Sequence, residues 1–161
     1  MLLTSDDGAS VELRIAGYEC PDVDLTDEAD PEWELNWLVV EGRARTADGV
    51  TWSFAEPILT TWEARRLGVW LHAVVRGRIR RYRRRRNGML TFTEPNLGFA
   101  LRRHDGEDVV LRVRLGHESG PTGARRPSRH RDADVTLHLA TGALRDAVTD
   151  WERELSAYPR R

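Results

Sequence analysis

The sequence predicts an α+β fold, a twisted and mostly antiparallel sheet of about seven strands with two amphipathic helices on one face. Apolar residues alternate with polar ones in several short segments, and they recur at helical spacing in two longer ones. Short turns join most of the strand segments, which favours antiparallel neighbours. The 161 residues are 40% hydrophobic and 32% charged, as in a globular protein. We expect one domain over residues 1–161, with the element order βββ-α-ββββ-α.

Three strands are predicted before the first helix, because apolar and polar residues alternate there. The pair Asp48-Gly49 is typical of the hairpin turn that would join the second strand to the third. The expected strands lie at residues 10–16, at residues 35–45 and around Trp52 and Phe54.

Two helices are predicted, each with a single apolar face that can cover part of the sheet. The first is expected over residues 61–76, where Thr60 and Glu63 have the spacing of a capping box. The second is expected over residues 142–157, with Thr141 as its N-cap.

Four further strands are predicted by the same alternation, all of them between the two helices. They are expected around Leu90 and Phe92, from Leu97 to Leu101, from Val109 to Leu115 and from Val135 to Leu139. The face of the sheet away from the helices should be hydrated, because polar side chains line it. These are Glu12, Arg14, Arg43, Arg45, Arg112, Arg114, Thr136 and His138.

The charge of the chain is nearly balanced overall but divided along its length. All 25 basic residues are arginine, and the formal net charge is −1. Residues 1–50 hold 13 acids and 3 arginines, whereas residues 51–100 hold 3 acids and 10 arginines. The start of the sequence has no signal-peptide pattern, and no apolar run is long enough to cross a membrane, so we expect a cytoplasmic protein. Cys20 is the single cysteine, so we expect no disulfide.

The acidic segment, Glu19–Glu34, has eight acids in sixteen residues and no basic residue. One interpretation is an anionic surface that captures a basic partner, with Trp33 as an aromatic anchor. The other is a solvated loop between two strands. Calcium is disfavoured because the central glycine of an EF-hand loop is missing. The candidate partner-binding residues are Asp22, Asp24, Asp27, Glu28, Asp30, Glu32 and Trp33.

The arginine run, Arg76–Arg86, has eight arginines in eleven positions. Arginine forks with an interleaved aromatic suit a phosphate backbone, so one interpretation is nucleic-acid binding. The alternatives are a solvated loop, favoured by the mutual repulsion of the charges, or docking onto the acidic segment of the same chain. The candidate nucleic-acid contacts are Arg78, Arg80, Arg81, Tyr82, Arg83 and Arg84. Flexible loops are expected near residues 19–34, 77–88 and 117–133.

No motif for catalysis, a metal or a cofactor is recognisable. The five histidines have no metal-ligand spacing, and the nucleophile-elbow, zinc-protease, phosphate-loop and dinucleotide patterns are all missing. The absence of lysine also excludes Schiff-base chemistry. The sequence therefore predicts a protein without catalytic residues, without a metal and without a cofactor.

Several segments, taken in order, resemble the bacterial WapI-like immunity protein family from about residue 10 to residue 159. They are Val11–Tyr18 with Pro21-Asp22, Asn36–Gly42, Thr51–Phe54, Leu59–Glu63, Phe92–Phe99 and Leu111–Leu115. The resemblance implies a non-catalytic antitoxin that binds the C-terminal domain of a cognate toxin and neutralises it. It also implies that the toxin could be a tRNA nuclease, whose basic surface would suit the acidic segment.

Overall fold

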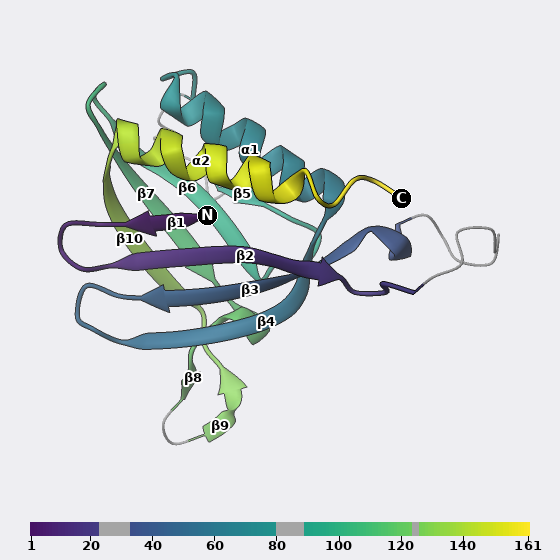
Figure 1. Cartoon of the computed structure of the whole chain (residues 1–161). Helices are drawn as coiled ribbons and strands as arrows, with labels where there is room; N and C mark the ends of the chain where they lie inside the picture. The colour runs from purple at the N-terminus through teal and green to yellow at the C-terminus, as the bar shows by residue number, and fades with distance from the viewer. Residues whose placement is uncertain (23–32, 80–88, 124–125) are drawn as a thin grey trace.

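The chain folds into an α+β structure built from two antiparallel sheets and two helices (Figure 1). The computed structural model describes residues 1–22, 33–79, 89–123 and 126–161. Within this part of the chain one sheet has the strand order β1-β2-β3-β4 and the other has the order β10-β7-β6-β5. The α+β class is confirmed, but the prediction of a single seven-stranded sheet is wrong.

The first sheet is formed by consecutive strands, so each strand pairs with its neighbour in sequence. The strands are β1 (Leu2–Thr4), β2 (Ser10–Tyr18), β3 (Trp37–Arg45) and β4 (Thr51–Thr60). β1 was not predicted, because three residues are too few to show alternation. Leu35 was expected in a strand but lies in a short 3-10 helix, η1 (Glu34–Asn36).

The second sheet is formed by β5 (Leu90–Thr91), β6 (Leu97–His104), β7 (Asp108–Leu115) and β10 (Ala133–Ala140). Phe92 was expected in the first of these strands but follows it. The region near 117–133, expected as a flexible loop, contains the 3-10 helix η2 (His117–Ser119) and the strands β8 (Thr122–Gly123) and β9 (Arg126–His130).

The helices α1 (Thr61–Val75) and α2 (Thr141–Leu155) pack side by side (Figure 1). The predicted capping box of α1 is present: Glu63 N–H donates to Thr60 Oγ1, and the Glu63 carboxylate accepts from Thr60 N–H. The N-cap of α2 is Ala140 rather than Thr141. The Thr141 hydroxyl instead donates to the carbonyl of Gly106 at 3.0 Å, so it ties the helix start to the β6–β7 turn.

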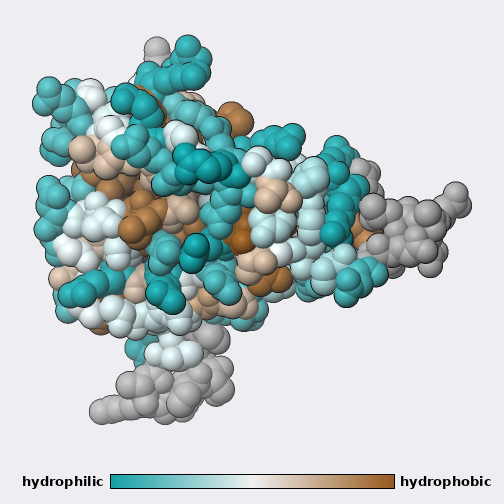
Figure 2. Space-filling model, viewed as in Figure 1, coloured by the Kyte–Doolittle hydropathy of each residue, from teal (hydrophilic) through white to brown (hydrophobic). Residues whose placement is uncertain are grey.

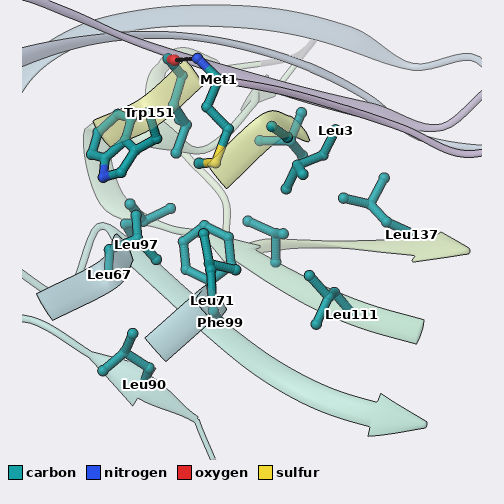
Figure 3. Packing of buried hydrophobic residues seen from close by; sticks show 14 of the residues in the cluster. Met1, Leu3, Leu67, Leu71, Leu90, Leu97, Phe99, Leu111, Leu137 and Trp151 are labelled. Carbon is teal, nitrogen blue, oxygen red and sulfur yellow. Dashed lines mark hydrogen bonds between the residues drawn. The ribbon is translucent and has the colours of Figure 1, made fainter. Parts of the chain in front are cut away.

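One hydrophobic core joins both sheets and both helices (Figure 3). Val11, Leu13 and Ile15 enter it from β2, as their alternation predicts. The sheets are also linked at their edges, because the His138 N–H of β10 donates to Ser5 Oγ just after β1, at 3.0 Å. The largest buried side chains of the cluster include Trp151, Phe99, Leu67, Leu71, Leu97 and Leu111.

Two sheets leave two outer faces where one was predicted. Glu12, Arg14, Arg43 and Arg45 lie on the first sheet, and Arg112, Arg114, Thr136 and His138 lie on the second. This correction has a simple cause: alternation assigns a residue to a face of its strand but does not say which strands share a sheet.

Candidate partner-binding surface

The acidic segment leaves the fold after β2 and returns to it at η1 (Figure 1). Its described ends are residues 19–22 and 33–34, and all of these residues are exposed. Trp33 is 52% exposed, an unusual value for a large aromatic side chain. The two ends therefore present carboxylates and one aromatic ring to solvent.

Asn36 fixes the returning end of the acidic segment. Its side chain is fully buried, and its Oδ1 accepts from the Thr61 hydroxyl at 2.9 Å and from Arg161 N–H at 3.0 Å. Its Nδ2 donates to the carbonyl of Arg161 at 2.9 Å. The amide thus joins three distant parts of the chain: η1, the start of α1 and the tail after α2.

The tail also holds the departing end of the acidic segment. The Arg161 guanidinium lies 3.6 Å from the centre of the Tyr18 ring and donates to the carbonyl oxygens of Cys20 at 2.9 Å and Pro21 at 3.3 Å. The Tyr18 hydroxyl donates to the carbonyl of Pro159. We call Tyr18, Asn36 and the tail Tyr158–Arg161 the clasp, because together they bind both ends of the acidic segment.

Aromatic contacts strengthen the clasp. The rings of Tyr18 and Tyr158 meet edge to face with centres 5.6 Å apart, and the Tyr158 hydroxyl donates to the carbonyl of Ile15 at 3.2 Å. The guanidinium of Arg160 lies 5.6 Å from the ring of Trp62 on α1. The tail is therefore held by the sheet and by a helix at once.

Replacing Asn36 with alanine is expected to lower the free energy of unfolding by about 2 kcal/mol, because a buried hydroxyl and two backbone groups lose their partner. Chemical denaturation of the full chain measures the change. Glu34→Ala is the matched control, since Glu34 lies in the same 3-10 helix but is exposed, and it should cost less than about 0.5 kcal/mol. Equal effects of the two substitutions would contradict the clasp.

Only part of each predicted site falls within the described residues. Asp22 and Trp33 lie exposed at opposite ends of the acidic segment. The other candidate partner-binding residues, Asp24, Asp27, Glu28, Asp30 and Glu32, lie outside the described residues, so their role stays a prediction.

The predicted nucleic-acid contacts are divided in the same way. Arg78 is exposed just after α1, where its N–H donates to the carbonyl of Ala73 at 2.8 Å. Arg80, Arg81, Tyr82, Arg83 and Arg84 lie outside the described residues. Nucleic-acid binding by this run therefore stays a prediction.

The outer face of the first sheet is hollowed between β2 and β4. A cavity of about 420 Å³ opens there. Charged residues of β2 and β3 line it together with Gly42 and three residues of β4; the lining is Glu12, Arg14, Glu41, Gly42, Arg43, Ser53, Phe54 and Ala55. Gly42 makes room for the Phe54 ring, since a Cβ at this position would lie 2.0 Å from the ring. Figure 2 shows this side of the molecule, where hydrophilic and less polar residues are intermingled.

The arginines of the two outer faces differ in their partners. On the second sheet Arg112 pairs with Asp134 at 3.5 Å, and Arg114 pairs with Asp132. The hydrogen bond from Arg114 holds the pKa of the Asp132 carboxyl below its usual value. On the first sheet no carboxylate of the described residues forms an ion pair with Arg14, Arg43 or Arg45.

Sequence reasoning missed the clasp and the hollow. The second helix was expected to extend to residue 157, yet it ends at Leu155, and Tyr158 belongs to the tail that follows. The available signal was the run Tyr158–Arg161, in which an aromatic residue and a proline are followed by two arginines. Nothing local connects that run to Asn36, which is 125 residues away.

Comparison with known proteins identifies the family of the chain. In the described part of the chain none of the helices is long and apolar enough to span a membrane. Searches of curated proteins and of solved structures give no match. The model of the immunity protein WapI-like family matches residues 1–159, nearly the whole chain. The chain therefore belongs to the WapI-like immunity protein family.

Proposed function

We propose that this protein neutralises a cognate toxin by binding the C-terminal toxin domain in the cytoplasm, without catalysing a reaction. The observation that carries the proposal is the family match over residues 1–159. The clasp supports it, because a segment whose two ends are fixed loses less conformational entropy when a partner binds.

In the proposed mechanism the acidic segment covers the surface on which the toxin holds its substrate. A toxin that cleaves tRNA must attract phosphates, so its active surface is basic. Carboxylates on the immunity protein compete for the same arginines and lysines and speed the encounter of the two proteins. The exposed Asp22 and Trp33 are the described residues best placed to make such contacts.

The first experiment is co-expression with the toxin domain that we expect to be encoded beside this chain. We expect restored growth and a stable complex on size-exclusion chromatography. Reversing Asp22, Asp24, Asp27 and Glu28 to lysine should weaken the complex by about 100-fold, mainly by slowing association. Surface plasmon resonance at two salt concentrations measures both rates.

A control reversal separates local contact from net charge. Asp6, Glu94, Glu107 and Asp146 are exposed carboxylates outside the acidic segment, and reversing them changes the net charge by the same amount. This variant should bind within about threefold of the unmodified chain, because salt screens distant charges. Equal losses in both variants would reject the acidic segment as the binding surface.

A further inference from the structure

We infer that the free edge of β4 is a docking site for an extended strand of the toxin domain, which would add to the first sheet beside β4. This inference rests on the proposed function, since it assigns a second contact to the same partner. It concerns a surface of the fold that is separate from the acidic segment.

β4 lies at the border of its sheet in Figure 1. Among the residues that the structure describes, β3 is the strand that pairs with it, and no other strand bonds to its opposite edge. The 3-10 helix η2 also packs against β4, where the Trp52 indole N–H donates to the carbonyl of Ser119 at 2.9 Å, so this contact is made through a side chain and not through the backbone of the edge. Thr51, Ser53 and Ala55 are exposed along this edge. A border strand with open backbone groups is a template for another strand.

The register shows which backbone groups of β4 point away from the sheet. Thr46 N–H donates to the Val50 carbonyl at 2.9 Å, so this pair is hydrogen-bonded. In an antiparallel pair, hydrogen-bonded and non-bonded positions alternate. Continuing along the register, Trp52 and Phe54 bond to β3, whereas the N–H and C=O groups of Thr51, Ser53 and Ala55 point outward.

Pro57 confirms this alternation independently. It pairs with Val39 at a non-bonded position of the β3–β4 ladder, so its missing N–H belongs to the free edge. The open part of the edge thus ends at Pro57, and three consecutive outward positions precede it. That length matches the short strands that commonly complete a sheet in strand-addition complexes.

The side chains on this edge do not protect it. Proteins commonly block exposed edges with lysine, with other charges or with proline. Thr51, Ser53 and Ala55 are uncharged, and Ser53 and Ala55 are small enough to leave the hollow open above them. An incoming strand therefore meets neither a charge nor a bulky side chain at these positions.

The charges beside the edge identify the kind of strand that fits. Three charged residues of β3 lie opposite this edge on the exposed outer face: Arg45 opposite Thr51, Arg43 opposite Ser53 and Glu41 opposite Ala55. An added strand would lie two strand spacings from β3, about 10 Å away. An arginine side chain of β3 is long enough to reach this strand above the small residue of β4 that lies between them. The matching strand carries carboxylates two positions apart on this face.

The test uses proline at the centre of the edge. Ser53→Pro removes an outward N–H and leaves the β3–β4 ladder intact, as Pro57 already does four residues later. Binding of the toxin domain should weaken by at least about tenfold, whereas Ser53→Ala, which keeps both the N–H and a small side chain, should bind as the unmodified chain does. Equal affinity of the two variants would overturn the inference.

A second measurement needs no substitution. Amide hydrogen exchange followed by NMR should be fast at Thr51, Ser53 and Ala55 in the free chain and slow in the complex. Phe54, whose N–H faces β3, should be protected in both states. Fast exchange at the three positions in the complex would overturn the inference. Slow exchange at these positions in the free chain, together with dimer formation, would also overturn it, because the edge would then bind a second copy of the chain.

The charge of the strand is tested separately. Arg43→Glu with Arg45→Glu should weaken binding by about tenfold, and the control Arg65→Glu with Arg145→Glu on the exposed helix surfaces should not. Unchanged affinity would reject an acidic strand. If the unmodified chain fails to bind the toxin domain, both the proposed function and this inference are rejected. If the chain binds and none of the edge variants changes its affinity, only the inference is rejected.

Discussion

Replacing Trp151 with alanine is expected to lower the free energy of unfolding by about 4 kcal/mol. Trp151 is fully buried, and its indole N–H donates to the carbonyl of Ala64 on α1 at 2.9 Å. The substitution leaves a large cavity between α1 and α2, and the Ala64 carbonyl keeps its helical hydrogen bond but loses the indole donor. Urea denaturation of the full chain measures the loss.

Trp151→Phe is the matched control, because it keeps an aromatic ring and removes the N–H donor. It should cost about 1–2 kcal/mol, the part that belongs to the hydrogen bond and to the smaller ring. A loss below about 1 kcal/mol for Trp151→Ala would mean that the helices do not pack through this residue.

Replacing Glu63 with alanine is expected to lower the free energy of unfolding by about 3 kcal/mol. Its carboxylate is buried; one oxygen accepts from Thr60 N–H at 3.1 Å, and the other accepts from Thr93 N–H at 2.7 Å and from the Thr93 hydroxyl at 2.9 Å. The substitution removes one half of the capping box and leaves the partly buried Thr93 N–H and hydroxyl without this acceptor, and each of these lost hydrogen bonds to a carboxylate costs about 1 kcal/mol.

Glu63→Gln separates the two sides of this carboxylate. The amide keeps one acceptor oxygen, so it can serve either Thr60 or Thr93 but not both, and the loss should be about half as large. Thermal unfolding monitored by circular dichroism ranks the variants. An alanine variant as stable as the glutamine variant would show that the link from α1 to the β5–β6 connection contributes little.

Local patterns predicted the local structure of this protein well. The capping box at Thr60 and Glu63 was predicted by spacing alone, because a helix N-terminus depends on residues that are close in sequence. Alternation likewise placed Val11, Leu13 and Ile15 in the core. Each signal lies within one turn of helix or within one strand, which is why a single sequence reveals it.

What the sequence did not reveal depends on contacts between distant segments. The two-sheet arrangement depends on which strands neighbour one another, and a strand's alternation is the same in either sheet. The clasp joins Asn36 to Arg161 over 125 positions, and Tyr18 to Pro159 over 141. The free edge of β4 could be inferred only once the register was known, because the pairing of β4 with β3 decides which N–H groups of β4 point outward.

The clasp also has a consequence for the order of folding. The strands β1 to β4 pair with sequence neighbours and can form while the rest of the chain is still being synthesised. Asn36 and Tyr18, in contrast, must wait for residues 158–161 before their hydrogen bonds can close. We therefore expect the base of the acidic segment to be completed after the first sheet has formed. A nascent chain would then carry its sheet well before it could hold that segment in place.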